Sequence, residues 1–160
     1  MYVLANSNLY STFDINSAVS AVDNQQVGNL WKGDYMITAS LSGEFSYLDK
    51  NSGKVSRHID GHSKAITALT VSDDDTLFTG SYDGRVFGWK YGAEGDRTKA
   101  ERIEGEGHGN QVTSLAFKQN ELLSVAMDDT VRQAGNNDFK FRYRVMQKGN
   151  KMKFMLNICK

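Results

Sequence analysis

The sequence predicts an all-β fold assembled from repeated four-stranded antiparallel sheets. Similar segments recur after a little more than forty residues, short apolar runs show strand-like alternation, and Gly, Asn, Asp and Ser gather between the runs. With 15 Gly and no Pro in 160 residues, the turns depend on glycine and on small polar residues. Short strands of regular spacing, separated by such turns, are typical of sandwiches, barrels and propellers.

Three copies of one motif set the period of the chain. The segments SLSGEFSYLD, SYDGRVFGWK and AMDDTVRQAG align with Gly43, Gly84 and Asp129 in register, and these positions are 41 and 45 residues apart. Repeats of about 40–45 residues with four strands each are typical of propeller blades. The predicted fold is therefore a partial, incomplete β-propeller.

Each repeat is expected to contain up to four strands. The inner strand alternates apolar and polar residues and is predicted at Gln26–Lys32, Ala65–Val71 and Gln111–Phe117. The second strand is short and apolar, as expected of a strand covered on both faces, in YMITAS, TLFTGS and ELLSVA. Phe45, Val86 and Val131 align in the third strand, and polar outer strands are predicted at 54–59 and 99–103.

The repeats divide the chain into about two full blades and parts of two others. The predicted parts are a remnant blade, two full blades and a partial blade, at residues 1–24, 25–60, 61–104 and 105–134. Within the remnant, Tyr2–Leu4 and Leu9–Phe13 are strand candidates. Because a propeller closes with typically four to eight blades, open blade edges are expected, and they offer a surface to other proteins.

Residues 135–160 depart from the repeat. They hold seven basic residues and one acidic residue, so this segment is near +6 and residues 1–134 are near −6. Aromatic and basic residues alternate from Phe139 to Arg144, and a turn is predicted at Gly149 and Asn150, which favours a β-hairpin with one basic face. Such a hairpin could bind single-stranded nucleic acid, but a solvated strand pair is the preferred interpretation.

The remaining composition favours a cytoplasmic protein. Cys159 is the only cysteine, which excludes a disulfide framework and a cysteine-based zinc motif and suits a reducing compartment. The first residues lack the basic and apolar regions of a signal peptide. No apolar run approaches the length of a membrane span, so no membrane association is expected.

Ser81, His62 and Asp83 combine the side chains of a catalytic trio. Nucleophilic catalysis needs a hydroxyl, an imidazole that takes its proton and a carboxylate that orients the imidazole. The blade pattern suggests another use: His62 would bond Asp83 and Ser81, and Ser81 would accept the indole N–H of Trp89. Such a network satisfies buried polar groups that would each cost about 1–3 kcal/mol unpaired. The structural interpretation is preferred, with no catalytic residues.

The third copy keeps only part of this pattern. His108 and Asp128 are present, but the positions of Ser81 and Trp89 are taken by alanines, Ala126 and Ala134. A network that weakens from copy to copy favours a scaffold over a reaction centre.

No cofactor or metal site is expected from other motifs. The Gly105–Gly109 run lacks the Lys-Ser/Thr of a phosphate loop, and Asp73–Asp75 lack the further ligands of a calcium loop. The three histidines, His58, His62 and His108, show no metal-ligand spacing.

The segment from Gly61 to Trp89, with its Gly-His pair, its Ser-x-Asp-Gly turn and its terminal Trp, resembles a WD-repeat blade. VDNQQVGNLWKG and GHSKAITAL, within Val22–Leu69, resemble the actin-interacting protein 1 family of WD-repeat proteins, and the likeness extends over about residues 1–132.

This resemblance implies a non-enzymatic interaction module of the actin cytoskeleton. Family members carry two seven-bladed propellers, bind actin filaments and enhance filament disassembly by cofilin, so actin and cofilin are the expected partners. The alternative is a truncated or orphan WD-repeat scaffold that binds other proteins through its blade edges. Partner-contacting residues are not predicted.

Overall fold

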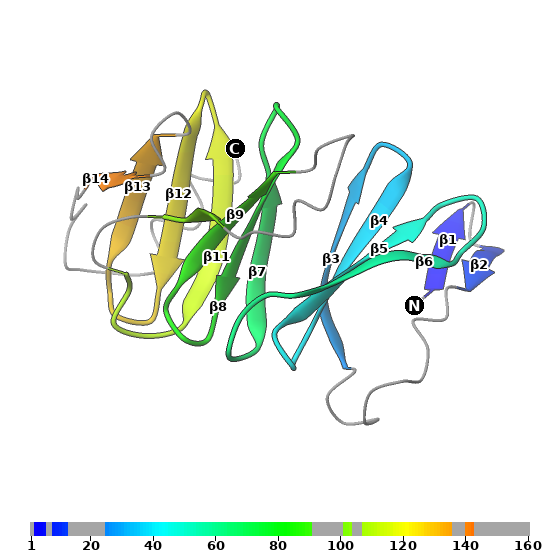
Figure 1. The fold of residues 1–160 in the computed structure, drawn as a ribbon, viewed down its shortest axis with the longest axis horizontal. Coiled ribbons are helices and arrows are strands. Elements are labelled where there is room, and N and C mark those ends of the chain that lie inside the picture. The colour runs from blue at the N-terminus through cyan, green and yellow to red at the C-terminus, as the bar shows by residue number, and fades with distance from the viewer. Residues whose placement is uncertain are drawn as a thin grey trace. The chain divides into compact units, whose positions relative to one another are not determined.

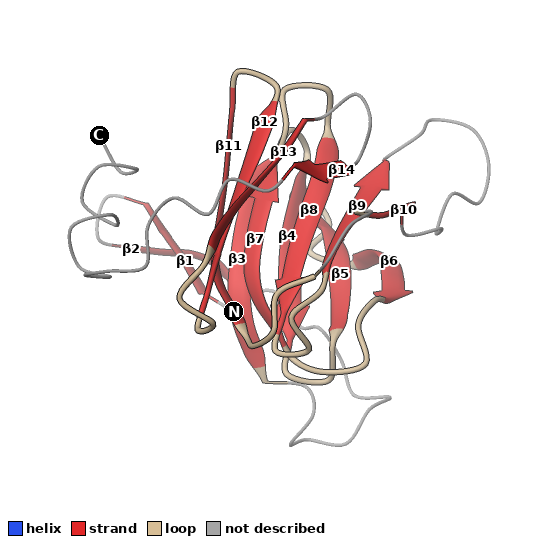
Figure 2. Ribbon diagram, turned by 90° about the vertical axis from the view of Figure 1, so that its left-hand side faces the viewer, coloured by secondary structure: helices blue, strands red, loops and turns tan. Residues whose placement is uncertain are grey.

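The computed structural model describes residues 2–5, 8–12, 25–90, 101–103, 107–135 and 140–142. These residues form fourteen β-strands and no helix (Figures 1 and 2). The chain divides into two compact units, Met1–Ile66 and Thr67–Lys160. The all-β prediction is confirmed.

The first unit contains a two-stranded hairpin and one four-stranded sheet. The hairpin pairs β1 (Tyr2–Ala5) with β2 (Asn8–Thr12). The sheet is an antiparallel meander in chain order, formed by β3 (Gln26–Lys32), β4 (Tyr35–Ser40), β5 (Glu44–Asp49) and β6 (Val55–Asp60).

Burial in the first sheet follows its sequence pattern. Exposed and half-buried residues alternate along β3, whereas five of the six residues of β4 are buried. Tyr47 makes edge-to-face ring contacts with Tyr35 at 6.2 Å and with Phe45 at 5.9 Å between ring centres. The two central strands therefore carry the core of this sheet.

The second unit contains two four-stranded sheets. The first runs β7-β8-β9-β10 and the second β11-β12-β13-β14, both in chain order. Their bounds are β7 (Ile66–Val71), β8 (Thr76–Ser81), β9 (Val86–Lys90), β10 (Glu101–Arg102), β11 (Val112–Lys118), β12 (Glu121–Ala126), β13 (Val131–Gly135) and β14 (Lys140–Arg142). β7 begins at the last residue of the first unit.

An apolar core lies between the two sheets of the second unit. It consists of Phe78, Val86, Ile103, Val112, Leu115, Leu122 and Ala134. Phe78 stacks on Phe117 with ring centres 5.7 Å apart, and the Thr67 hydroxyl donates to the carbonyl of Val112. The sheets thus pack as successive blades, and burial of the apolar area between them is the main favourable term.

The tight turns of the first two sheets each contact a Gly-His segment further along the chain, residues 61–62 or 107–108. The Gly84 carbonyl accepts the His108 N–H at 3.0 Å, and the Gly43 carbonyl accepts the His62 N–H at 2.9 Å. A β-carbon at Gly84 would lie 2.3 Å from the carbonyl oxygen of His108. Glycine is therefore required by close backbone approach as well as by its φ of 78°.

The predicted strands are confirmed with small shifts at their ends. The outer strands expected at 54–59 and 99–103 correspond to β6 and β10. Lys140–Arg142, expected outside the repeat, pair with β13 as the fourth strand of the third sheet. The basic hairpin predicted around Gly149 lies outside the described residues and stays a prediction, as do the blade boundaries.

Candidate functional site

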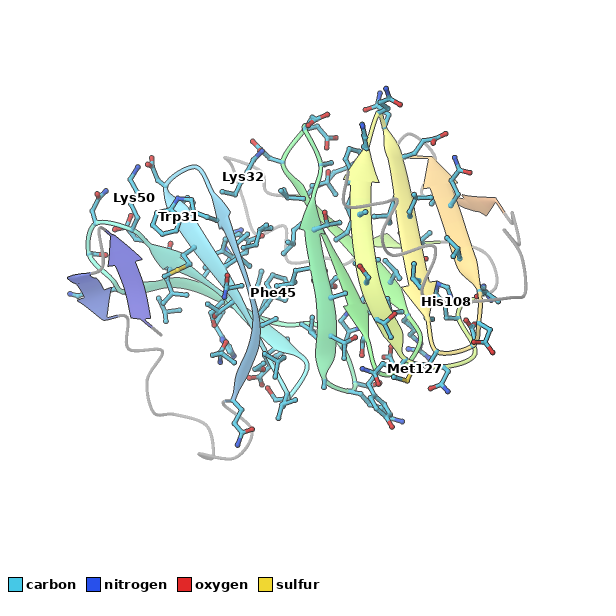
Figure 3. All side chains as sticks on the ribbon, turned by 180° about the vertical axis from the view of Figure 1, so that it is seen from behind. Trp31, Lys32, Phe45, Lys50, His108 and Met127 are labelled. Atoms are coloured by element: carbon cyan, nitrogen blue, oxygen red, sulfur yellow. The ribbon has the colours of Figure 1, made fainter. Side chains whose placement is uncertain are left out.

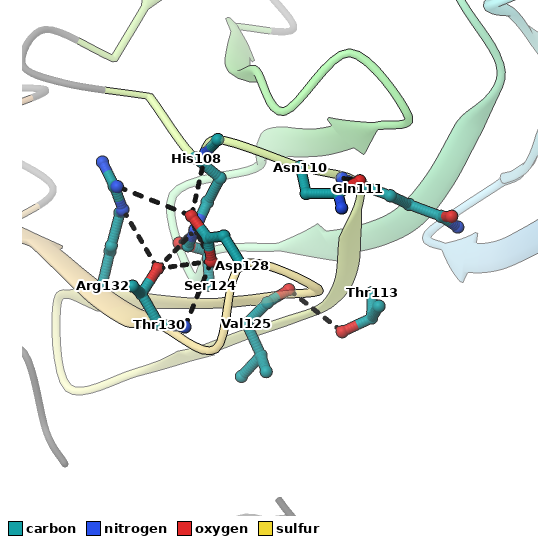
Figure 4. Close-up of polar contacts among 10 residues, drawn as sticks. His108, Asn110, Gln111, Thr113, Ser124, Val125, Asp128, Thr130 and Arg132 are labelled. Atoms are coloured by element: carbon teal, nitrogen blue, oxygen red, sulfur yellow. Dashed lines mark hydrogen bonds and ion pairs between the residues drawn. The ribbon is translucent and has the colours of Figure 1, made fainter. Parts of the chain in front are cut away.

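The sheet β11–β14 holds a buried polar network centred on His108 (Figure 4). His108 lies in the Gly-His segment before β11, Ser124 lies on β12, and Asp128 lies in the turn that follows β12. His108 Nε2 is 2.7 Å from Ser124 Oγ, and Nδ1 is 2.9 Å from Thr130 Oγ1 and 3.3 Å from each oxygen of Asp128. The turn thus brings a carboxylate to one side of the imidazole and the strand brings a hydroxyl to the other.

Asp128 is held by hydrogen bonds from three directions. It accepts the Thr130 hydroxyl at 2.6 Å, the Gly109 N–H at 2.8 Å and the Thr130 N–H at 3.1 Å. Arg132 Nη2 lies 3.7 Å from the same carboxylate. These contacts link the turn after β12, the strand β13 and the Gly-His segment in one hydrogen-bonded network.

The network shifts the pKa of both titratable groups. Burial lowers the pKa of His108 below 6.5 and outweighs the Asp128 carboxylate, which raises it. Burial would raise the pKa of Asp128, but the hydrogen bonds from Thr130 and Gly109 outweigh burial and lower this pKa to about 2. At neutral pH the imidazole is therefore neutral and the carboxylate is ionised.

The neighbours of the neutral imidazole assign its tautomer. A carboxylate only accepts hydrogen bonds, so Nδ1 carries the proton and Nε2 accepts the Ser124 hydroxyl. This chain of hydroxyl, imidazole and carboxylate has the order of a catalytic trio. However, Ser124 and the His108 side chain are both 0% exposed, so no substrate reaches the hydroxyl, and the contacts brace the blade.

In the second sheet, Trp89 is confirmed as a buried residue, but its predicted partner is wrong. The indole N–H donates to the hydroxyl of Thr79 at 2.8 Å, not to Ser81. Trp89 lies opposite Leu77 in the ladder, and Thr79 is two residues further along the same face. Ser81 is another two residues away, about 13 Å from Leu77 along an extended strand, beyond reach of the ring.

Ser81 and Asp83 instead shape the turn that they border. The Ser81 hydroxyl accepts the Asp83 N–H at 3.2 Å, and Asp83 accepts the Arg85 N–H at 2.9 Å. His62 is 92% buried. Its predicted bonds to Ser81 and Asp83 would join the two units and stay a prediction.

The hydroxyl of the network was assigned to the wrong position by sequence reasoning. Ser124 lies two residues before Ala126, as Thr79 lies two residues before Ser81. Thr38 has the same position in the first sheet, and all three hydroxyl residues are 0% exposed. The expectation that the third copy lacks the hydroxyl of the network, because Ala126 replaces the serine, is therefore incorrect: Ser124 supplies it. The second strand of each repeat contains a hydroxyl residue near its centre, and this recurrence is the sequence signal that identifies the three residues.

Equivalent tight turns also expose apolar side chains. Leu41, Tyr82 and Met127 occupy the same position of the three repeats and are 41%, 52% and 53% exposed. Met127 lies in the turn after β12 (Figure 3). Among the described residues, a different cluster, Glu44, His58 and Asp60, combines metal-ligating groups.

Comparison with known proteins places the chain in a class. Residues 53–90 match the family described as WD domain, G-beta repeat. The designed Ika4 protein has a TM-score of 0.66 and 21% identity over 84% of this chain and 79% of its own chain. The designed Ika8 protein has a TM-score of 0.60 and 24% identity over 73% of this chain and 35% of its own. The chain therefore contains a WD repeat, and its three sheets have the fold of partial propeller blades.

Within this class, the chain resembles Actin-interacting protein 1 of Drosophila melanogaster, with 43% identity over 71% of this chain and 18% of the relative. WD repeat-containing protein 1-A of Xenopus laevis is 40% identical over 81% of this chain and 21% of the relative. WD repeat-containing protein 1 of Gallus gallus is 41% identical over 79% and 20%. The chain spans about a fifth of the length of these relatives. Its described residues include no helix long and apolar enough to cross a membrane.

Proposed function

We propose that this protein is a non-enzymatic interaction module that binds actin filaments and promotes their cofilin-dependent disassembly in the cytoplasmic actin cytoskeleton. The observation that carries the proposal is the 43% identity, over 71% of this chain, to a protein named Actin-interacting protein 1. The resemblance noted in the sequence adds cofilin as the second partner.

The buried network supports a binding role over a catalytic one. Ser124, His108 and Asp128 use their hydrogen-bonding groups on one another and on adjacent backbone. A nucleophile needs access to its substrate, which Ser124 lacks at 0% exposure. The structure therefore favours rigid blades that present their turns to a partner.

Tyr82 and Met127 are the proposed filament contacts in the second unit. They lie on equivalent turns of two packed sheets, and each exposes about half of its surface, 52% and 53%. Tyrosine is among the residues enriched in binding hot spots, and methionine is enriched at interfaces. Because they recur at the same position of successive blades, they form a row of exposed apolar side chains. Such a row suits a partner built of repeated subunits, such as a filament.

The disassembly activity is tested by fluorescence microscopy of single actin filaments. With cofilin at a concentration that fragments filaments slowly, addition of the protein is expected to increase the number of severing events per filament length. Without cofilin, the protein alone is expected to leave the filaments intact. An unchanged severing rate in the presence of cofilin contradicts the proposal.

The contact surface is tested with a double variant, Tyr82→Ser with Met127→Ser. Losing two interface anchors is expected to weaken filament binding at least tenfold, since each tenfold change needs only about 1.4 kcal/mol. Val55→Ser is the matched control, because Val55 is an apolar residue of similar exposure, 38%, on the outer strand β6. An equal loss of filament binding in the double variant and in Val55→Ser would contradict the assignment of Tyr82 and Met127 as filament contacts.

The second candidate is a scaffold that associates through an exposed blade face. Val27 and Trp31 occupy exposed positions of the alternating strand β3 and are 49% and 51% exposed; Figure 3 labels Trp31. Exposed apolar groups of this kind mark interaction surfaces. Size-exclusion chromatography with light scattering tests it. Concentration-dependent association that Trp31→Ser abolishes supports this candidate, and a monomer at all concentrations rejects it.

A further inference from the structure

Three metal-ligating side chains converge on the outer two strands of the first sheet. Glu44 and Asp60 are paired residues in the ladder of β5 and β6, and His58 pairs with Ser46 two residues along. Because side chains at i and i+2 share a face of a strand, all three ligands lie on one face. One ligand atom from each lies within 4.8 Å of the other two.

The spacing of the first two ligands suits a tetrahedral metal ion. His58 Nε2 and Glu44 Oε2 are 3.3 Å apart. Zinc binds nitrogen and oxygen ligands at about 2.0–2.1 Å, so two ligands at a tetrahedral angle are about 3.3–3.4 Å apart. A metal ion between these atoms therefore requires little movement of either side chain.

Hydroxyl groups hold both of these ligands in position. The Ser46 hydroxyl is 2.8 Å from His58 Nδ1, and Ser46 is only 3% exposed. Without a metal ion, Nε2–H faces the Glu44 carboxylate and Nδ1 accepts the Ser46 hydroxyl. When a metal ion displaces the Nε2 proton, Nδ1–H donates to Ser46 and the lone pair of Nε2 points to the metal. The Ser42 hydroxyl donates to Glu44 Oε2 at 3.1 Å. Outer hydrogen bonds of this kind orient metal ligands in proteins.

The site is also accessible and has a suitable charge. The side chains of His58 and Glu44 are 44% and 22% exposed, and Asp60 is exposed, so an ion and its water can enter. Two carboxylates balance a divalent cation. An imidazole ligand favours zinc over the oxygen-binding ions calcium and magnesium.

We propose that Glu44, His58 and Asp60 form a zinc site, completed by water, that fastens the outer strand β6 to β5. This site is independent of the filament-binding surface proposed above. A bound ion that contacts both strands stabilises the folded state over the unfolded state by mass action.

Isothermal titration with zinc chloride tests the proposal. The experiment uses a Cys159→Ser background, because the thiol of Cys159 is a competing zinc ligand. We expect one zinc ion per chain, and an affinity at least tenfold lower in His58→Gln and in Glu44→Gln. Ser46→Ala removes only the orienting hydroxyl and is expected to lower the affinity about tenfold. Asp34→Asn is the control, since Asp34 is an exposed acid of the same unit that pairs with Lys50.

Two further measurements separate a built site from adventitious binding. Cobalt(II), which replaces zinc, is expected to give the intense visible bands of tetrahedral coordination, and His58→Gln is expected to abolish them. Zinc is also expected to raise the unfolding temperature of the parent protein and not of His58→Gln. Absence of 1:1 binding, or binding that His58→Gln and Glu44→Gln leave unchanged, overturns the proposal.

Discussion

His108 is buried between a hydroxyl and a carboxylate. This position determines the protonation state of His108 that stabilises the sheet β11–β14. The neutral imidazole donates from Nδ1 to the Thr130 hydroxyl and the Asp128 carboxylate, and it accepts from Ser124 at Nε2. Protonation would place a second donor against the serine and a charge in a buried position. Folding should therefore favour neutral His108 and ionised Asp128.

The first prediction concerns acid sensitivity. His108 has a lowered pKa in the folded state, so its contribution is fully present above about pH 6.5, its usual value, and is lost as the pH falls further. Urea unfolding from pH 8 to 5 should show a steeper fall in the free energy of unfolding for the parent protein than for His108→Gln. Parallel profiles of the two proteins would contradict the assigned state of His108.

The second prediction extends the titration to Asp128. Its pKa falls from 3.8 to about 2 on folding, so its stabilisation is present above about pH 4 and is lost between about pH 4 and 2. Because solvent partly screens this carboxyl, the stabilisation is on the order of 1 kcal/mol, less than the shift alone would give. Asp128→Asn should therefore unfold more easily than the parent protein at pH 7, and the gap should narrow as the pH approaches 2. A constant gap would show that ionisation of Asp128 has no part in the bracing.

The third prediction concerns Trp89, which is 3% exposed and bonded to Thr79. Trp89→Ala should lower the free energy of unfolding by about 3–5 kcal/mol, because it leaves a cavity and an unpaired hydroxyl. Trp89→Phe keeps most of the buried ring and should cost less. A loss below about 1 kcal/mol for Trp89→Ala, measured by urea unfolding, would refute its role in the core.

At the scale of elements, a tight turn joins the two blades of the second unit. Gly84 has a φ of 78°, and its carbonyl accepts the N–H of His108. Gly43 makes the same contact with His62. The positive φ and the close approach are two separate demands for glycine.

The fourth prediction separates these two demands. Gly84→Ala should lower the free energy of unfolding by at least about 2 kcal/mol, because the new methyl group meets a backbone oxygen at 2.3 Å. Gly33→Ala is the matched control, since Gly33 has a φ of 54° but no atom within 4 Å of an added β-carbon. Similar losses in the two variants would show that backbone strain alone accounts for the effect.

At the scale of the whole molecule, the repeat explains why most strands could be predicted and some partners could not. Phe45, Val86 and Val131 mark the third strand through apolarity alone, and the structure places strands there. Thr79 was missed as the partner of Trp89 because the distance between side chains on adjacent strands depends on register, which one sequence does not display.

The fourth strand of the third sheet was missed for a related reason. Lys140–Arg142 lie in a basic segment that does not align with the other outer strands, yet they pair with β13. Outer strands are polar and exposed, so almost any sequence compatible with backbone pairing can occupy them. The zinc ligands were likewise hidden, because Glu44 and His58 are brought together by strand pairing and not by close spacing in sequence.

The proposed function depends on binding by the folded blades. The relatives share about 40% identity with most of this chain, which spans about a fifth of their length. The described residues supply packed sheets and a row of exposed turns, and the proposal is that these suffice to bind a filament.

Co-sedimentation with actin filaments is the measurement that tests this claim most directly. The account predicts that the protein enters the pellet in a saturable manner as filament concentration rises. It also predicts that Tyr82→Ser with Met127→Ser leaves the protein in the supernatant while Val55→Ser does not. Recovery of the folded parent protein in the supernatant at every filament concentration would contradict the account.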